Sequence, residues 1–298
     1  MKTPFEHASS FWVRYDRYEC RRAADGHQYI LPAADAMPRP YDPMRNAEQL
    51  VVDALNVGML CLNEAADPEI KKAVLGFVSR YGLLGLMTAI PTTPAFMEYH
   101  SVYLLKNQFI RDEAMDTEAY LDLFQPFDKL RIVKRGKESR WDLSDKTMIA
   151  LALTFREKPM AQQMCFMREY GERYDWLTAQ FKDWAFAFCS CFLYYDDYES
   201  LDENTRDLYR LGMAAFDGIA PSYHIELREK PTLVWDFHSL LLAIQMLFSF
   251  MLTDEKNTLT LCPNCKKVFP ANRPNMVFCS ASCRMEYNAK RRNGRDEG

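Results

Sequence analysis

From Ala47 onward, most of the chain carries apolar side chains three or four residues apart, the spacing that places them on one face of an α-helix. This pattern predicts helices that begin at Ala47 and at Asp67, and one long helix or two stacked helices over residues 160–195. Two further helices are expected over residues 205–216 and 234–252. The chain is therefore expected to be mainly α-helical.

Two stretches depart from the helical spacing. The first 45 residues are rich in aromatic and charged side chains and contain Pro32, Pro38, Pro40 and Pro43, which favour turns over regular structure. They are expected to form an irregular arm. Apolar and polar side chains alternate over residues 223–227, which predicts one short strand.

The composition is that of a folded globular protein. Of the 298 residues, 48% are hydrophobic and 26% are charged, which excludes a disordered or collagen-like chain. Only 11 residues are glycine, and neither GxGxxG nor GxxxxGK[ST] occurs, so a dinucleotide-binding or P-loop enzyme is not expected. The first residues lack the apolar run of a signal peptide, and the longest apolar run, residues 239–252, is too short to cross a membrane. A cytoplasmic protein with no membrane partner is expected.

Four of the nine cysteines follow a metal-binding pattern. They are spaced C-x2-C-x13-C-x3-C, at Cys262, Cys265, Cys279 and Cys283. Two close pairs of thiolates can converge on one tetrahedral ion, and four cysteines leave no coordination position open for a catalytic water. The spacing therefore predicts one structural Zn2+, with an iron–sulfur cluster or four unrelated thiols as the alternatives. The other five cysteines show no regular framework, and disulfides are not expected.

The residues around these cysteines predict a small zinc ribbon made of a short β-hairpin and a helix. The two residues inside the first pair favour a tight turn that directs backbone N–H groups at the sulfurs. Val268 is expected to begin the hairpin, with residues 276–278 as its return strand. Ser280 is placed to cap a helix that begins near Ala281, so that Cys283 lies in the first helical turn.

Positive charge is concentrated in the same segment. The whole chain has a formal net charge of −4, yet residues 262–295 carry eight Lys or Arg against one acid. A basic stripe on an anchored helix can neutralise phosphates, while Asn288 or an arginine reaches a base edge. A solvated or protein-binding helix is the alternative. The expected nucleic-acid contacts are Lys266, Lys267, Arg273, Arg284, Asn288, Lys290, Arg291, Arg292 and Arg295.

This segment resembles the C-terminal zinc finger of the CGNR family of bacterial transcription regulators. The resemblance lies in a Cys-x2-Cys pair at residues 262–265, a Phe-Cys-Ser-x2-Cys-Arg run at residues 278–284, and a basic run at residues 288–292. The family's Gly-Asn-Arg after the last cysteine is replaced here by Arg-Met-Glu at residues 284–286, which makes the chain a divergent relative. The resemblance implies zinc at the four cysteines, a helical domain before the finger, and a nucleic-acid contact through the basic helix. The whole chain also resembles an uncharacterised bacterial family in which a helical body of about this size carries such a finger.

Together these features predict two parts. Residues 1–256 are expected to form a mainly helical, acidic body that senses a ligand or binds a partner, and residues 257–298 a zinc ribbon with a basic helix. The expected function is that of a zinc-dependent nucleic-acid-binding protein, more narrowly a bacterial transcription regulator that contacts DNA. The alternative is a protein-interaction module in stress response or mobile-element defence, with a purely structural zinc site. An enzyme is not expected. A ribonuclease site in the body is the alternative, because Arg22 and His27 have the spacing of a ribonuclease motif, although they lie in a Gly- and Pro-containing segment and not in a helix.

Overall fold

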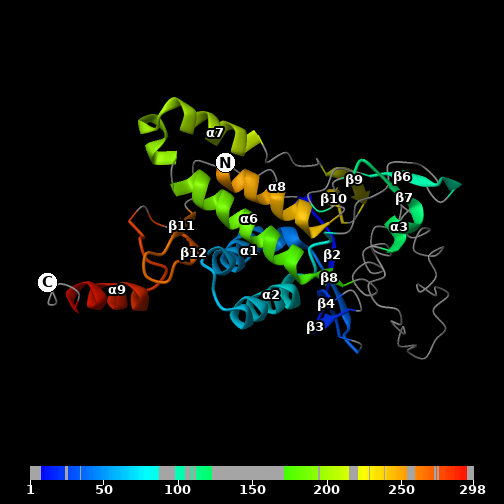
Figure 1. Cartoon of the computed structure of the whole chain (residues 1–298), viewed down its shortest axis with the longest axis horizontal. Coiled ribbons are helices and arrows are strands. Elements are labelled where there is room, and N and C mark those ends of the chain that lie inside the picture. Colours follow the sequence, from blue (N-terminus) through cyan, green and yellow to red (C-terminus); the bar gives the residue numbers. More distant parts are fainter. Residues whose placement is uncertain are drawn as a thin grey trace. The chain divides into compact units, whose positions relative to one another are not determined.

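The chain divides into two compact units, each assembled from segments far apart in the sequence (Figure 1). The first unit comprises Met1–Asn46, Lys71–Thr178 and Ile219–Ile244, and the second comprises Ala47–Ile70, Ala179–Gly218 and Gln245–Gly298. The structure is a computed structural model that describes residues 8–23, 26–33, 35–86, 98–104, 109, 112–122, 171–193, 195–214, 221–227, 229–237, 239–253, 259–271, 273 and 275–293. The expected boundary between residues 256 and 257 lies outside these residues and stays a prediction.

The first unit is built on small sheets with the orders β2-β5, β3-β4-β8, β1-β10-β9 and β6-β7. Neighbouring strands are antiparallel except for β1 and β10, which are parallel. The strands are β1 (Ala8–Ser9), β2 (Trp12–Tyr15), β3 (Tyr18–Arg22), β4 (Gln28–Pro32), β5 (Pro38–Tyr41), β6 (Ser101–Tyr103), β7 (Ala114–Asp116), β8 (Glu172–Arg173), β9 (Ser222–Leu227) and β10 (Pro231–Asp236). Its helical elements are η1 (Pro43–Asn46), most of α2 (Asp67–Tyr81) and α3 (Thr117–Asp122).

These strands correct the expected mainly α class. About 50% of the structure is helical and 23% lies in strands, so the fold is mixed α/β. The first 45 residues, expected to be an irregular arm, contain β1 to β5, and the side chains of Trp12 and Tyr15 are buried. The prolines are compatible with these narrow sheets. Pro38 and Pro40 belong to β5, which pairs with β2 alone among the described strands, and Pro32 is the last residue of β4.

Within the first unit, a buried carboxylate joins β8 to the loop after α2. Glu172 of β8 accepts hydrogen bonds from three consecutive backbone N–H groups, those of Leu84, Gly85 and Leu86, in the loop after α2. Gly85 has a positive φ of 77°, and the chain turns there so that successive N–H groups face one anion. Burial raises the pKa of Glu172 to about 7, although the three N–H donors favour the charged form.

The second unit is mostly helical. It contains α1 (Ala47–Leu62), most of α6 (Tyr174–Leu193), η3 (Tyr195–Ser200), α7 (Glu203–Ala214), the second part of α8 (Leu240–Thr253), β11 (Leu259–Leu261), β12 (Val268–Pro270) and α9 (Ala281–Asn293). Its core includes the buried side chains of Leu50, Phe181, Trp184 and Phe188. Helix α1 lies close against α6 at Gly58, where a Cβ atom would lie 2.0 Å from the carbonyl oxygen of Phe181.

Helical spacing located most of the helices. α1 and α2 begin at the expected residues, α7 covers most of the helix expected over residues 205–216, and β9 confirms the strand expected over residues 223–227. For the helix expected over residues 234–252, the predicted start was wrong, because β10 extends to Asp236 and α8 begins at Leu240. Both elements are apolar there, so the spacing of apolar residues could not separate strand from helix. Of the segment expected to be one long helix or two stacked helices over residues 160–195, the start at residue 160 lies outside the described residues. A single helix over this range was wrong, because residues 172–173 form β8 and α6 covers Tyr174–Leu193.

Candidate metal centre

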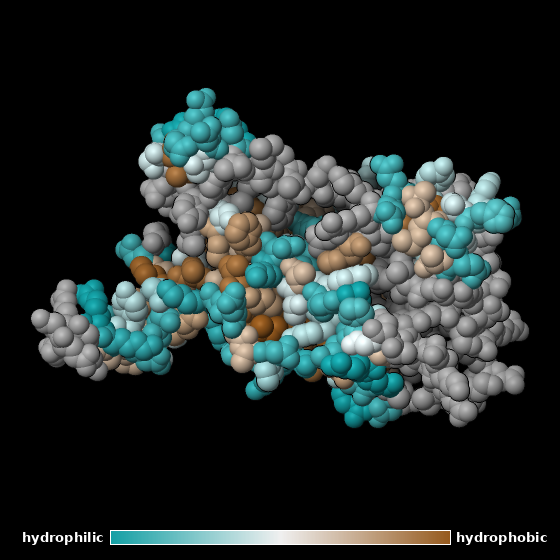
Figure 2. Space-filling view, in the orientation of Figure 1, coloured by the Kyte–Doolittle hydropathy of each residue, from teal (hydrophilic) through white to brown (hydrophobic). Residues whose placement is uncertain are grey.

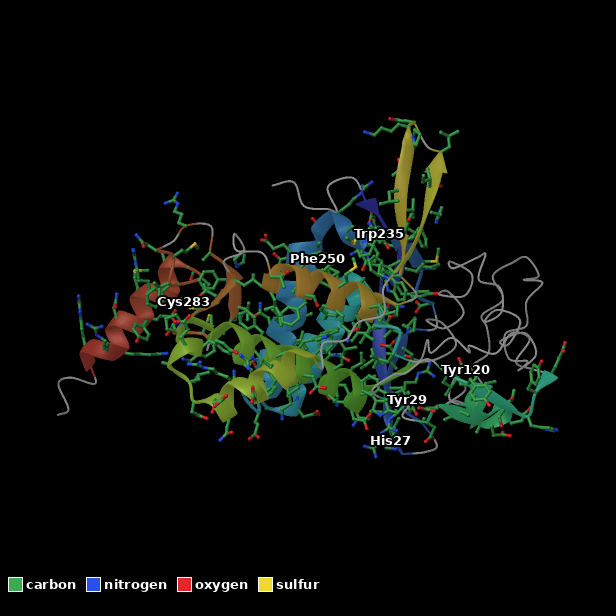
Figure 3. All side chains as sticks on the ribbon, turned by 90° about the horizontal axis from the view of Figure 1, so that it is seen from above. His27, Tyr29, Tyr120, Trp235, Phe250 and Cys283 are labelled. Atoms are coloured by element: carbon green, nitrogen blue, oxygen red, sulfur yellow. The ribbon has the colours of Figure 1, made fainter. Side chains whose placement is uncertain are left out.

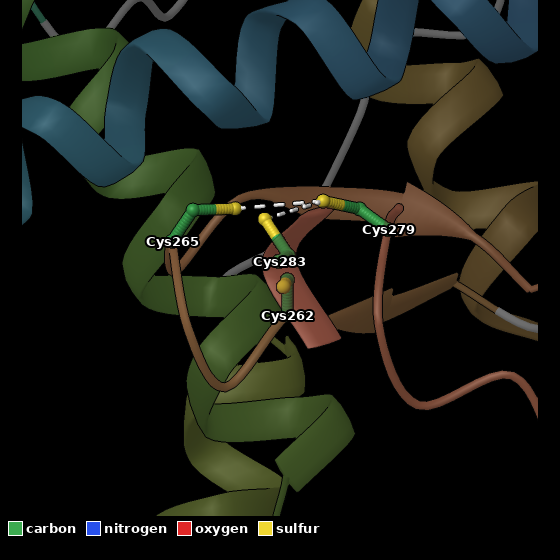
Figure 4. Close-up of side chains that lie close together, drawn as sticks. All are labelled: Cys262, Cys265, Cys279 and Cys283. Carbon is green, nitrogen blue, oxygen red and sulfur yellow. Dashed lines mark hydrogen bonds between the residues drawn. The ribbon is translucent and has the colours of Figure 1, made fainter. Parts of the chain in front are cut away.

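Four sulfur atoms converge in the C-terminal segment (Figure 4). The Sγ atoms of Cys262, Cys265, Cys279 and Cys283 all lie within 4.8 Å of one another. The Sγ of Cys279 is 3.6 Å from that of Cys265 and 3.5 Å from that of Cys283. A tetrahedral ion with metal–sulfur bonds of about 2.3 Å separates its sulfurs by about 3.8 Å, so these four thiols are close enough to hold a metal ion. The predicted convergence of the four cysteines is confirmed.

The first two cysteines lie in the turn that joins β11 to β12. The backbone N–H of Cys262 donates to the carbonyl of Lys267 at 2.9 Å, and the N–H of Lys266 donates to the carbonyl of Cys262 at 2.8 Å. Lys266 has a φ of 57°, in the left-handed region, which lets the chain reverse direction in so few residues. Backbone N–H groups, including that of Asn264, point at the sulfur of Cys262, as the composition of the turn predicted.

The other two cysteines are placed by the start of α9. Ser280 precedes the helix, and its Oγ accepts a hydrogen bond from the backbone N–H of Cys283 at 3.1 Å. This is the N-cap predicted from the sequence, and the helix begins at Ala281 as expected. Cys279 lies immediately before the cap and Cys283 in the first turn, so the cap geometry fixes the separation of these two thiols.

The surroundings of the thiols affect their charge differently. Burial opposes the thiolate of Cys262, but backbone N–H groups outweigh it and lower its pKa to about 6. A hydrogen bond between the side chain of Ser280 and the thiol lowers the pKa of Cys283. Burial, together with the neighbouring sulfurs, raises the pKa of Cys279 to about 12, and burial raises the pKa of Cys265. A metal ion favours all four thiolates at once, because its charge outweighs their mutual repulsion.

Asn264 connects the turn to α9. Its Nδ2 donates to Oε2 of Glu286 at 2.9 Å, and its Oδ1 accepts from Nζ of Lys290 at 3.3 Å. The hydroxyl of Ser282 donates to the other carboxylate oxygen of Glu286 at 3.0 Å. These bonds hold the helix beside the turn, a positioning role that cysteine spacing did not indicate. One signal was present, because Glu286 is the one acid among the basic residues of this segment.

The hairpin of this segment uses a different partner strand from the one expected. Strand β12 does begin at Val268, but it pairs with β11, on the amino-terminal side of the first cysteine, and not with residues 276–278. The bond between the N–H of Cys262 and the carbonyl of Lys267 continues this ladder into the turn. Met276 and Phe278 pack against the cluster formed by the cysteines and their buried neighbours.

A side chain of α1 also holds β12. The Nδ2 of Asn56 donates to the carbonyl of Val268 at 3.0 Å, and its Oδ1 accepts from the N–H of the same residue at 2.8 Å. A carboxamide offers a donor and an acceptor side by side, as a peptide group does, so Asn56 adds one further rung of hydrogen bonds to the edge of β12. The metal-binding segment, which comprises β11, the cysteine turn, β12 and α9 (residues 259–293), is thereby bonded to the helical core of the second unit.

The basic residues of the segment lie at its surface. The expected nucleic-acid contacts that the structure describes are all exposed, and they are Lys266, Lys267, Arg273, Arg284, Asn288, Lys290, Arg291 and Arg292. Arg295 lies outside the described residues. Along α9 from residue 281 to 292, only Cys283 and Tyr287 are partly buried, and Figure 2 shows hydrophilic residues on the visible side of this helix. The cations are therefore accessible, and their contact with nucleic acid stays a prediction.

The pair considered for ribonuclease chemistry lies in a hairpin. Arg22 ends β3 and His27 precedes β4, and neither is on a helix, as the sequence indicated. Nδ1 of His27 is 3.8 Å from Oδ2 of Asp175, a carboxylate that also bonds to Arg173. The bond from Arg173 lowers the pKa of Asp175. These contacts account for His27 as part of a surface cluster of polar side chains, and the absence of enzymatic activity stays a prediction.

Comparison with known proteins identified no relative. No family model, no curated protein and no solved structure matches the chain. The resemblance to the CGNR zinc finger and the cytoplasmic location therefore stay predictions. Within the part of the chain that the structure describes, no helix is both long enough and apolar enough to cross a membrane.

Proposed function

We propose that the chain binds nucleic acid through a C-terminal segment ordered by one zinc ion. The observation that carries the proposal is the convergence of four cysteine sulfurs at the start of a helix whose accessible surface is basic. Zn2+ suits this donor set, because four thiolates in a closed tetrahedral arrangement are typical of structural zinc. Cys262, Cys265, Cys279 and Cys283 would hold the ion.

Metal binding supports the fold of this segment. Among the described residues, the buried cluster around the cysteines consists of Cys262, Phe269 and Ala271, which is too little apolar surface for a stable core. Structural zinc sites contribute on the order of 10 kcal/mol to the folding of small domains, so the ion supplies the missing stabilisation. α9 contacts the rest of the segment through Cys283, through Tyr287 and through the bonds of Glu286 and Lys290 to Asn264, so its orientation depends in part on the ion.

Oriented cations are what a phosphate-binding helix requires. Arg284, Asn288, Arg291 and Arg292 recur every three or four residues along one side of α9, while Lys290 bonds to Asn264 on another side. Such a stripe can follow a phosphate backbone and bring Asn288 to a base edge. More narrowly, we propose duplex DNA as the target and a role in bacterial transcription, on the basis of the resemblance of the segment.

A binding titration tests the proposal. The zinc-loaded full chain is titrated against labelled mixed-sequence duplex DNA and single-stranded RNA at several salt concentrations. We expect affinity to fall steeply with salt and to disappear when a chelator removes the zinc. The double variant Arg291→Gln/Arg292→Gln is expected to reduce the slope of log affinity against log salt by about two, because each lost phosphate contact removes about one. Lys230→Gln, at an exposed lysine in the turn after β9, is the matched control and is expected to leave the slope unchanged. A zinc-loaded chain that binds neither nucleic acid at low salt refutes the proposal.

The second candidate is a protein-interaction module with a purely structural zinc site. The bonds between Asn56 and Val268 favour it, because they make the metal-binding segment a packing element of the helical core. In this case neither DNA nor RNA binds, while removal of zinc still lowers the thermal stability of the chain. Unfolding with and without zinc, measured beside the titration, distinguishes the two candidates.

A further inference from the structure

Strand β9 forms the outer edge of its sheet. In the order β1-β10-β9, it pairs with β10 alone among the described strands, and the register is continuous from Ser222 opposite Asp236 to Leu227 opposite Pro231. Residues 223–227 are all exposed, and Figure 3 shows β9 and β10 as one hairpin with Trp235 labelled on β10. Natural proteins usually protect such an edge with lysine, proline or a bulge. Residues 222–227 contain no lysine, proline or bulge, and Glu226 is their one acid, so β9 is suited to pairing with a further strand that faces this acid with a suitable partner.

One face of β9 is apolar and the other is charged. Tyr223, Ile225 and Leu227 alternate along the strand and are 66%, 71% and 82% exposed, respectively. His224 and Glu226 point to the opposite face, because successive side chains of a strand alternate. A row of three large, exposed apolar side chains beside this edge marks an interaction surface.

We propose that β9 pairs antiparallel with β9 of a second copy of this chain, about a two-fold axis through Ile225. In this register Ile225 lies opposite itself, Tyr223 opposite Leu227 of the second copy, and His224 opposite Glu226 of the second copy. All apolar side chains then meet apolar side chains on one face. On the other face each histidine meets a carboxylate, and a protonated histidine and a carboxylate are opposite charges, whose pairing across two strands is favourable. The three-stranded sheets of two copies would join into one sheet of six strands.

The pattern selects this register and this partner. Moving the axis by one residue would place Glu226 opposite Glu226 or His224 opposite His224, and like groups directly opposite one another are destabilising. The side-chain order of β9 is therefore complementary to itself in one alignment. A foreign strand would have to supply the same order, whereas a second copy always does, and this favours self-association.

Single cysteines in the full chain test the register. Ile225→Cys places the new thiols opposite each other, with Cα atoms about 5 Å apart, which a disulfide can bridge. We expect mild oxidation of the zinc-loaded variant to give a covalent dimer well above the wild-type level. Leu227→Cys is the matched control at an equally exposed position, because its two copies lie four residues apart, about 13 Å, beyond the reach of a disulfide. A mixture of Tyr223→Cys and Leu227→Cys chains is expected to cross-link although each variant alone does not.

Sedimentation of the same full chain measures the association itself. We expect a concentration-dependent dimer that Ile225→Lys weakens at least tenfold, because it places two like charges on the axis. His224→Glu is also expected to weaken the dimer, and His224→Glu/Glu226→His to restore it, since the exchange recreates the opposite-charge pairs. Circular dichroism confirms that each variant is folded. A monomer at every concentration, equal cross-linking at positions 225 and 227, or a dimer that Ile225→Lys leaves intact each overturns the proposal, and a monomer that captures another protein through β9 does so as well.

Discussion

Replacing Asn56 by alanine tests whether metal binding is coupled to the helical core of the second unit. Alanine removes both hydrogen bonds to Val268, whose side chain is buried and whose backbone groups lose these partners. A hydrogen bond contributes about 0.5–1.5 kcal/mol, and an unsatisfied buried group costs about 1–3 kcal/mol, so we expect a loss on the order of 2–3 kcal/mol in the free energy of unfolding. The bonds exist only when β12 is in place. Zinc affinity should therefore fall by the same free energy, about 30- to 150-fold.

Two measurements check this coupling. Zinc affinity is measured by competition with a chromogenic chelator, and unfolding is followed by far-UV circular dichroism with and without zinc. Gln49→Ala is the control on the same helix, since Gln49 is exposed and bonds only within α1, to Asp53. It is expected to change neither quantity appreciably. A zinc affinity of Asn56→Ala within twofold of the wild-type value would refute the argument. Loss of the helical circular dichroism signal of the wild-type chain at the same denaturant concentration with and without zinc would also refute it.

Three further perturbations follow from the packing, the buried carboxylate and the thiol cluster. Gly58→Ala is expected to lower the free energy of unfolding by about 3 kcal/mol, because the added Cβ would overlap the backbone of α6. Gly76→Ala on α2 is the control: its Cβ would meet no atom within 4 Å, so this change should raise the free energy of unfolding by about 0.5–1 kcal/mol. Equal effects of the two variants in denaturant titrations would contradict this. Burial raises the pKa of Glu172 from 4.5 to about 7, so the stabilisation that its protonated form gives is complete below pH 4.5 and is lost as the pH rises through 7, on the order of 3 kcal/mol in all. Glu172→Gln should remove this pH dependence of the free energy of unfolding, measured by urea titration. An unchanged pH profile would show the reasoning to be wrong. Cys279→Ser is expected to abolish zinc binding, measured as the zinc content by elemental analysis. Cys20→Ser, at a cysteine outside the cluster, should retain the zinc. Equal zinc contents of the two variants would count against the site.

The metal cluster could be predicted because its determinants are local in sequence. Cys262 and Cys265 share one turn, and Ser280 caps the helix that carries Cys283, so spacing and capping rules were sufficient. The bond of Asn56 to Val268 joins residues 212 positions apart, and no local pattern indicates it. Single-sequence reasoning therefore found the ligands but missed what holds the metal-binding segment in place.

The strands near the amino terminus were missed for a different reason. The prolines of the first 45 residues predicted turns, although proline argues only against a central strand. Among the described residues the sheets have two or three strands, so each sheet consists largely of edge strands, and Pro38 and Pro40 are accommodated in β5. The alternation of β9 was recognised because no proline interrupts it. Sheet width, which depends on distant pairings, decides whether a proline excludes a strand.

The distance along the chain between Asn56 and Val268 also imposes an order of assembly during synthesis. A ribosome adds about 5–20 residues per second, so α1 emerges about 10–40 s before β12, its hydrogen-bonding partner. During that interval the surface of α1 around Asn56 is open to solvent and to other chains. A nascent chain halted before Val268 would expose this surface permanently, and a chaperone or protease could recognise it as the mark of an unfinished molecule.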